Sequence, residues 1–167
     1  MNIEIRDERP EDMQAIRDVT NEAFRFNSHA SGTEAAIIDA LRRADALKLS
    51  LVVAINNKLV GHIAFSPVTI EGRHAGWFGL GPVSVKPDLH GRGIGSALIN
   101  QGLLRLRQEG AKGCVVLGDP AFYRRFCFEN DPALHYEDAP AEYFMSLAFH
   151  DMKLSGKITF HEGFSAS

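Results

Sequence analysis

The segment DLHGRGIGSALINQGLLRL, residues 88–106, places three glycines at alternate positions just before an apolar, helix-forming stretch. Glycine weakens helices and strands, because its backbone loses the most conformational freedom on folding. Without a Cβ at positions 91, 93 and 95, successive backbone N–H groups can converge on one point at the positive end of a helix dipole. The segment therefore predicts a strand–turn–helix junction that holds a phosphate group. A tight turn packed close to a sheet is the alternative explanation of the same glycines.

Two well-known phosphate-binding loops do not fit this segment. The P-loop of nucleotide hydrolases needs a Lys and a Ser or Thr directly after its last glycine, whereas Ser96-Ala97-Leu98 follows here. A dinucleotide-binding fold would place such a loop after its first strand. In this chain the loop follows what we expect to be the fourth strand, so neither class of protein is indicated.

The N-terminal part of the chain predicts one strand followed by two helices. Residues 2–8 alternate apolar and polar side chains, as a half-buried strand does. Pro10 suits the first turn of a helix, and the expected buried face of that helix consists of Met13, Ile16, Val19 and Ala23. A second helix is expected from about Thr33, with an inward face made by Ile37, Ile38 and Leu41.

The rest of the chain predicts a sheet with further helices. Residues 49–70 form the clearest hairpin, because two β-rich runs flank an Asn-Asn turn. Residues 75–86 form a fourth strand, in which two glycines and a proline at 79, 81 and 82 indicate a bulge or the approach of another backbone. Later elements are a helix to about Glu109, a buried strand at 113–118, a short helix at 119–126, and strands at 143–149 and 156–162.

This order, β-α-α-β-β-β-α-β-α-β-β, predicts an α/β (α+β) fold with a mixed sheet flanked by helices. The chain has 167 residues and contains no repeat, low-complexity tract or linker, so we expect a single domain, 1–167. The formal net charge is −3 and no basic block is present, which argues against a nucleic-acid partner. No apolar run has membrane-spanning length and the N-terminus lacks the apolar core of a signal peptide. We therefore expect a cytoplasmic protein without a membrane partner.

Cysteines and histidines do not predict a metal site. Cys114 and Cys127 form neither a CxxC pair nor a metal-binding spacing with histidine, and the seven histidines are scattered. Both cysteines stand beside apolar residues, so we expect free, largely buried thiols.

The segment VSVKPDLHGRGIGSALI resembles motif A of the GNAT family of N-acetyltransferases, in which a strand ending in V-x-P leads to a Q/R-x-x-G-x-G/A turn and a helix. Downstream, AFYRRFCFE resembles the A-x-x-x-Y-x-x-x-G-F region of that family. The segments GLGPVSVKP, VVLGDPAFYRRFCF and LSGKITFHEGF, taken in order, are similar to its YhbS-like branch. The resemblance covers nearly the whole chain. It implies a mostly antiparallel sheet of about seven strands with about four helices, splayed between the fourth and fifth strands.

The resemblance also implies acetyl-coenzyme A (acetyl-CoA) as co-substrate, lying in the cleft between these two strands. Its pantetheine arm would pair with the fourth strand along Val83, Ser84 and Val85. Its pyrophosphate would lie on the turn formed by His90, Gly91, Arg92, Gly93, Ile94, Gly95 and Ser96. His90 stands where the family usually has Gln or Arg. His90 and Arg92 could equally be loop residues in solvent. Asp119 stands where relatives carry a polar residue facing the arm, although an Asp before Pro-Ala-Phe-Tyr is also an ordinary helix N-cap.

Tyr123 is the catalytic candidate, because it stands at the register of the family's tyrosine near the thioester sulfur. A phenol stays protonated at neutral pH and can protonate a departing thiolate. A packed core tyrosine is the alternative. Cys127 replaces the common glycine of the G-F pair, and a covalent acyl-cysteine is a second mechanism to weigh against direct transfer.

No carboxylate on the fourth strand offers a general base. Glu34 is a candidate from the helical side, but Ser31-Gly32-Thr33-Glu34 is also a capping-box sequence, which would explain the glutamate without catalysis. Phe24, Phe26 and His29 could line an acceptor pocket or simply belong to the core.

The resemblance thus implies transfer of an acetyl group from acetyl-CoA to a primary amine by direct attack. A coenzyme-A-binding sensor or interaction module without catalysis is the alternative from another class, and a longer acyl group is a third possibility. The negative net charge favours a cationic acceptor. The chain would work as a monomer or a homodimer.

Overall fold

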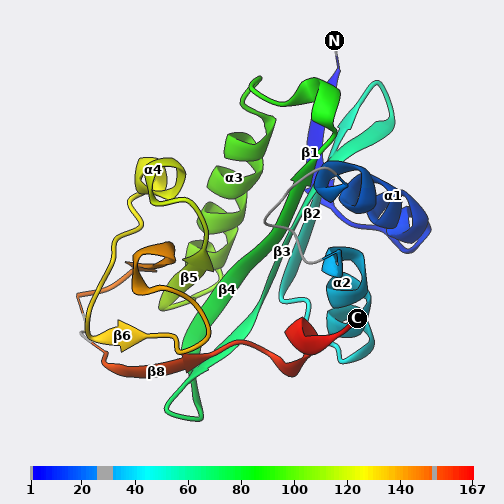
Figure 1. Ribbon diagram of the computed structural model, residues 1–167. Helices are drawn as coiled ribbons and strands as arrows, with labels where there is room; N and C mark the ends of the chain where they lie inside the picture. The colour runs from blue at the N-terminus through cyan, green and yellow to red at the C-terminus, as the bar shows by residue number, and fades with distance from the viewer. Residues whose placement is uncertain (1, 26–31, 152–153) are drawn as a thin grey trace.

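The β-rich middle of the chain forms the centre of one open sheet. The computed structural model describes residues 2–25, 32–151 and 154–167. Across these residues the sheet has eight strands, in the order β1-β2-β3-β4-β5-β7, with β8 beside β3 and β6 beside β8 (Figure 1). The strands are β1 (Ile3–Asp7), β2 (Leu49–Ile55), β3 (Lys58–Ile70), β4 (Arg73–Val85), β5 (Gly113–Leu117), β6 (Leu134–His135), β7 (Phe144–Ala148) and β8 (Gly156–Thr159).

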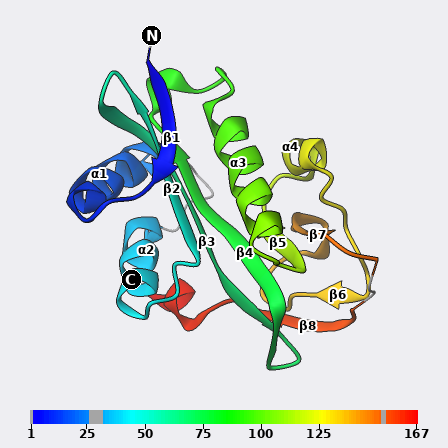
Figure 2. The same ribbon diagram turned by 180° about the vertical axis from the view of Figure 1, so that it is seen from behind.

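Helices cover both faces of this sheet. Helices α1 (Met13–Phe24) and α2 (Glu34–Arg43) lie on one face, and α3 (Ile94–Gln108) lies on the other (Figures 1 and 2). The main core forms between α3 and the sheet, where Leu98, Ile99 and Leu106 pack with Phe65. Short helix α4 (Pro120–Tyr123) adds its tyrosine to that same core. The two layers of helices therefore fix both sides of the central strands.

Strands β4 and β5 are paired along only a short stretch. They run parallel, and their register joins residues 77–79 to residues 113–115. Past Gly79 the described chain shows no further pairing between them, although β4 continues to Val85 and β5 to Leu117. On its other side β4 stays paired with β3 as far as Val85. This divergence confirms the predicted splay and leaves one edge of β4 without a neighbouring strand.

A bulge lies at the start of this free edge. Ile63 of β3 pairs with Val83, whereas Phe65 pairs with Leu80, so β4 holds one residue more than β3 between these pairs. The extra length falls at Gly81-Pro82, where proline also lacks the N–H that a ladder needs. Of the two interpretations of the residues at 79, 81 and 82, a bulge or the approach of another backbone, the bulge is confirmed.

The sequence predicted the order of the main elements correctly, with three differences. β6 is a two-residue strand between the expected helix at 119–126 and the expected strand at 143–149, where the sequence predicts no strand, and it raises the strand number from about seven to eight. The last strand ends at Thr159, before the expected residues 160–162. Met13 is 44% exposed rather than buried, because α1 begins at this residue and its buried face is formed by Ile16, Val19 and Thr20. No helix in the described ranges is long and apolar enough to cross a bilayer.

Candidate active site

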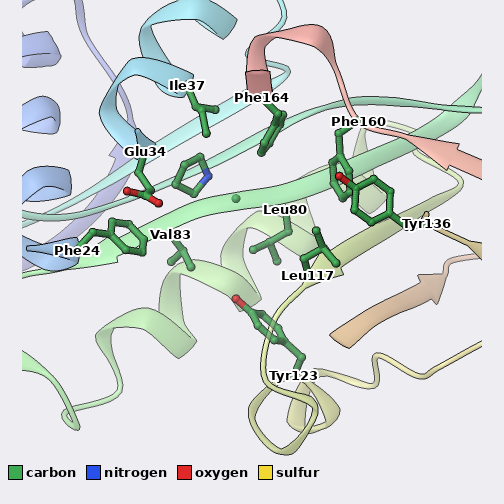
Figure 3. Close-up of a pocket in the computed structure, with 12 residues that line it drawn as sticks. Phe24, Glu34, Ile37, Leu80, Val83, Leu117, Tyr123, Tyr136, Phe160 and Phe164 are labelled. Atoms are coloured by element: carbon green, nitrogen blue, oxygen red, sulfur yellow. The ribbon is translucent and has the colours of Figure 1, made fainter. Parts of the chain in front are cut away.

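Two pockets open along the free edge of β4 and meet at Val83, which lines both. The glycine-loop pocket has a volume of about 350 Å³, and its lining residues are Val83, Val85, Leu89, His90, Gly91, Gly93, Ile94, Gly95, Ser96, Ile99, Phe122 and Arg125. The aromatic pocket has a volume of about 360 Å³, and its lining residues are Phe24, Glu34, Ile37, Leu80, Gly81, Pro82, Val83, Leu117, Tyr123, Tyr136, Phe160 and Phe164 (Figure 3). Both pockets border β4 because β4 and β5 diverge and leave this edge of β4 unpaired.

The glycine-loop pocket ends at the first turn of α3. Gly93 is the N-cap of this helix and has a φ of 81°, a left-handed backbone conformation that residues with a Cβ rarely adopt. The amide of Ala97 donates to the carbonyl of Gly93 at 3.0 Å, which begins the helical ladder. The preceding amides of the first turn have no acceptor within a helix. These N–H groups and the positive end of the helix dipole make this end of the pocket suited to an anion.

The loop is tied to the end of β4 by a histidine. The Nε2 atom of His90 lies 2.7 Å from the carbonyl oxygen of Val85, within hydrogen-bond distance. This contact joins the last residue of the strand to the start of the glycine turn. His90 thus fixes the position of the turn, and its ring occupies one wall of the pocket.

Eight of the residues predicted to bind the co-substrate line this one pocket: Val83, Val85, His90, Gly91, Gly93, Ile94, Gly95 and Ser96. Three others lie outside its lining. The hydroxyl of Ser84 is 3.4 Å from that of Thr20 on α1, so its side chain points to the opposite face of the sheet. Arg92 is exposed. Asp119 accepts a hydrogen bond from the amide of Ala121 at 3.0 Å, which is the N-cap arrangement considered from the sequence.

Arg125 and Phe122 belong to the glycine-loop pocket, and sequence reasoning missed both. The guanidinium of Arg125 lies over the ring of Phe122, 5.3 Å from its centroid. This stacking holds the positive charge of Arg125 at the same pocket as the first-turn N–H groups of α3, which have no acceptor within the helix. The basic pair Arg124-Arg125 at the end of the tyrosine segment was visible in the sequence. Only the fold shows which arginine faces the pocket.

Tyr123 lies where the two pockets join. It lines the aromatic pocket, while its neighbour Phe122 lines the glycine-loop pocket. Its ring packs edge-on against Phe122 and Phe128, with centroids 5.0 and 5.9 Å apart. Gly118 also fixes the ring, because a Cβ at that position would overlap Cε2 of Tyr123. Tyr123 is only 8% exposed, and burial raises its pKa to about 12.

Two polar groups point into the aromatic pocket from opposite faces of the sheet. Figure 3 shows the hydroxyl of Tyr123 reaching up from α4 and the carboxylate of Glu34 reaching in from α2, with Val83 of β4 between them. Both faces can contribute because no strand fills the space beside this part of β4. The arrangement places a proton donor and a carboxylate around one strand segment.

The predicted capping box stays a prediction, because its Ser31 lies outside the described part of the chain. Helix α2 begins at Glu34 and has Thr33 as its N-cap. From that position its side chain lines the aromatic pocket, together with Phe24 at the end of α1. The other residues named with it, Phe26, His29 and Ser31, lie outside the described part of the chain.

The far end of the aromatic pocket is built by the C-terminal part of the chain, which sequence reasoning also missed. The ring of Phe160 lies 5.1 Å from that of Tyr136 and 5.3 Å from that of Phe164. Phe164 belongs to a short 3-10 helix that packs on α2, where Gly163 contacts Leu41. In the sequence only Phe160 falls in an expected strand, 156–162, and no pattern brings any of the three aromatics near the glycine turn.

Cys127 lies away from both pockets. Its φ is 73°, which explains why glycine is common at this position in the family that the segment resembles. The residue is exposed, and it borders a separate hollow beside Leu104 and Arg107. The predicted largely buried thiol is therefore wrong for Cys127 and correct for Cys114, whose pKa burial raises. Within the described ranges no group of three His, Cys, Asp or Glu side chains could hold a metal ion.

Comparison with known families identifies the class of protein that this fold and site define. Residues 13–128 match the model of the acetyltransferase (GNAT) family, and this match covers most of the chain. The chain belongs to the GNAT acetyltransferase family, as its glycine turn and splayed sheet suggested.

Among curated proteins, the chain is similar to the uncharacterized N-acetyltransferases YhbS and YjhQ of Escherichia coli. It is 37% identical to YhbS over 109 residues, which is 65% of each chain, so the match spans just under two thirds of that relative. It is 33% identical to YjhQ over 138 residues, or 79% of this chain and 71% of that one.

Two solved structures resemble the chain over almost its whole length. A GNAT family acetyltransferase from Brucella melitensis, in complex with acetyl-CoA, is 48% identical with a TM-score of 0.88, covering 98% of both chains. YhbS from Escherichia coli, in complex with CoA, is 30% identical with a TM-score of 0.91, covering 99% of this chain and 93% of that one.

Proposed function

We propose that this protein binds acetyl-CoA and transfers its acetyl group to a primary amine by direct attack. The observation that carries the proposal is the meeting of the two pockets at Val83, which lines the aromatic pocket together with the buried Tyr123. The complexes of the Brucella relative with acetyl-CoA and of YhbS with CoA support the choice of co-substrate. The residues of the glycine-loop pocket fit such a ligand.

The fit of the co-substrate follows from the groups that the chain leaves unpaired. The first-turn amides of α3 can bind a pyrophosphate, and Arg125 adds a positive charge at the same pocket. The free edge of β4 offers backbone N–H and C=O groups to the amides of a pantetheine arm, as an added strand would use them. This alignment would bring the thioester to Val83, at the entrance of the aromatic pocket.

The proposed chemistry is a direct acyl transfer. The acceptor ammonium first loses a proton to water, and the neutral nitrogen forms a C–N bond to the thioester carbon. Backbone N–H groups of β4 near Val83 would stabilise the negative charge that develops on the carbonyl oxygen. The C–S bond then breaks and Tyr123 gives its phenolic proton to the sulfur. The proton released by the new amide nitrogen restores the phenol, so no proton is gained or lost by the enzyme.

Thiol release with a panel of amines tests this proposal, and Cys127→Ala separates direct transfer from an acyl-cysteine. We expect acetyl-CoA and at least one primary amine to yield free thiol, with the variant within about threefold of wild type, because Cys127 lies outside both pockets. Mass spectrometry after brief exposure to acetyl-CoA should show no acetyl group on this cysteine. A stoichiometric adduct that is competent for turnover would contradict direct attack.

A non-catalytic coenzyme-A-binding module is the second candidate function, favoured by the absence of a carboxylate on β4. It predicts tight binding of acetyl-CoA in calorimetry with no thiol release from any amine of the panel. The buried phenol at the pocket junction favours the enzyme, since a sensor has no use for a proton donor at this position.

Arg125 and Arg92 offer a matched pair for the phosphate contact. Arg125→Gln should raise the Kd for acetyl-CoA by roughly tenfold at low salt, because a hydrogen bond to a charged group contributes about 1.5–3 kcal/mol. The effect should shrink as salt screens the charges. Arg92→Gln should change the Kd by less than about twofold, because Arg92 lies outside the pocket lining. Calorimetry at two salt concentrations measures both, and the reverse ranking would restore Arg92 as the phosphate ligand.

A further inference from the structure

We infer that the acceptor is a small aromatic monoamine, bound with its amino group between Glu34 and Tyr123 and its ring against the aromatic wall formed by Tyr136, Phe160 and Phe164. This inference rests on the proposed function and names its substrate class. It follows from how polar and apolar groups are distributed in the aromatic pocket, which nothing in the glycine turn or the family comparison specifies.

The pocket has one polar end. Glu34 and the hydroxyl of Tyr123 both point toward the segment around Val83, where the thioester would lie (Figure 3). Of the described residues that line the pocket, Glu34 is the one with a charged side chain. A single carboxylate beside Phe24 suits a single ammonium group, because carboxylate and aromatic ring both attract a cation. The reacting nitrogen would therefore stand within reach of both the carboxylate and the thioester.

The other end of the pocket is mostly apolar, with the hydroxyl of Tyr136 as the polar atom that Figure 3 shows there. Figure 3 shows Tyr136 and Phe160 together at the end away from Glu34, with Phe164 beside them and Leu117 below. Burying the body of an amine here removes apolar surface from water, worth about 25 cal/mol per Å². A ring adds the preference of aromatic groups for edge-to-face and offset contacts. An amine whose body is a ring uses this end better than a short alkyl chain does.

The aromatic wall does not form a cage for a second ammonium. Tyr136 and Phe160 meet edge to face at 90°, and Phe160 and Phe164 are tilted by 50° with centroids 5.3 Å apart. Rings at these distances contact one another and leave no central space for a cation. A diamine would place its second charge against this wall without a carboxylate, which costs desolvation energy. Polyamines and lysine-like acceptors are thus disfavoured.

The volume sets the size of the acceptor. About 360 Å³ lies at the lower end of the range for small-molecule sites. The 3-10 helix Glu162–Ser165, which packs on α2, bounds the C-terminal side of this wall. An amino group borne on a peptide would need the rest of the peptide to leave the pocket on another side, so a free small amine is the simpler fit.

Kinetics with matched amines test the inference. Thiol release is measured for 2-phenylethylamine, ethylamine and 1,4-diaminobutane with the full-length protein saturated with acetyl-CoA. We expect kcat/KM for 2-phenylethylamine to exceed the other two values by at least about tenfold. Phe164→Ala should reduce the ratio of 2-phenylethylamine to ethylamine by roughly fivefold or more, because it removes a ring of the aromatic wall. Tyr143→Ala, an exposed aromatic outside both pockets, is the control and should leave the ratio unchanged.

Binding tests the charged end and separates this inference from the proposed function. Calorimetry with CoA-saturated protein compares 2-phenylethylamine with its neutral isostere 2-phenylethanol. The amine should bind more tightly by roughly tenfold, and Glu34→Gln should abolish most of that difference. Glu129 is an exposed glutamate outside both pockets, so Glu129→Gln is the control and should leave the difference unchanged. If no amine releases thiol but this binding pattern holds, the proposed transfer fails and the aromatic amine still occupies the pocket.

Other outcomes overturn the inference. Preferred turnover of 1,4-diaminobutane, of lysine peptides or of peptides with an aromatic first residue would assign another acceptor while leaving acetyl transfer intact. An unchanged amine ratio in folded Phe164→Ala would remove the aromatic wall from recognition. If that variant does not fold, Phe164→Leu keeps an apolar side chain without the ring, and the ratio should still fall by about twofold or more.

Discussion

Replacing Gly95 by valine should raise the Kd for acetyl-CoA by roughly 100-fold or more while the protein stays folded. The branched side chain would fill the part of the glycine-loop pocket where the pyrophosphate approaches the first turn of α3. Losing two charge-assisted hydrogen bonds would cost about 3–6 kcal/mol, and every 1.4 kcal/mol is a factor of ten. Calorimetry with acetyl-CoA measures the change.

Gly95 is the glycine of the turn that tests binding without disturbing the fold. A Cβ built here would meet only Cγ2 of Val85 at 3.7 Å, an ordinary contact. By contrast, Gly93 has a φ of 81°, so any substitution there would strain the backbone as well as block the pocket. Gly95 lies inside α3, where valine is a better helix former than glycine.

Gly95→Ala is the matched control for this substitution. Its single methyl group adds a Cβ without the branches, and alanine is an accepted residue at this position of the motif. We expect the Kd to change by less than about fivefold. Circular dichroism and thermal unfolding of both variants should resemble wild type. Unchanged affinity in folded Gly95→Val would remove the glycine turn from the binding site and restore its interpretation as a tight turn.

The glycine-loop pocket could be predicted from the sequence because its chemistry is local. Most of its lining comes from one continuous segment, residues 83–96, in which backbone amides rather than side chains would bind the proposed co-substrate. Glycine spacing and a following helix suffice to indicate such a site. Ser84, which lies outside the lining together with Arg92, shows the limit of this reasoning. Its backbone belongs to the free strand edge, but alternation along the strand directs its side chain toward Thr20.

The aromatic pocket could not be predicted in the same way, because its residues come from distant parts of the chain. Phe24, Tyr123 and Phe164 meet only after the C-terminal segment returns to pack on α2. Aromatic residues in a sequence of 167 residues are expected in the core, and no spacing distinguishes those that line a cavity. Arg125 was missed for the same reason, since a pair of adjacent arginines does not show which one faces inward. Tyr123 was found through its motif, and the fold explains its burial.

Tyr123→Phe should lower kcat by roughly 100-fold, at the lower end of the 10²–10⁴-fold typical of general acid–base catalysis. The change removes one hydroxyl and keeps the ring, so the edge-on packing with Phe122 and Phe128 should persist. The Kd for acetyl-CoA should stay within about twofold, because the glycine-loop pocket is untouched. A thiolate leaving group is only moderately basic, which lets water replace part of the donor's role. Equal losses in kcat and kcat/KM would mark an interaction made only in the transition state.

The pH dependence sharpens this last prediction. Burial raises the pKa of Tyr123 from its ordinary value of 10 to about 12, so the phenol stays protonated and able to donate throughout the range from pH 7 to 10. The wild-type rate should therefore rise as the amine loses its proton and show no alkaline fall below pH 10. A phenol with the ordinary pKa would be half ionised at pH 10 and would have lost half of its donor capacity. Steady-state rates of wild type and Tyr123→Phe across this range decide the matter. A variant that matches wild type at every pH would leave Tyr123 a packing residue and would favour the non-catalytic module.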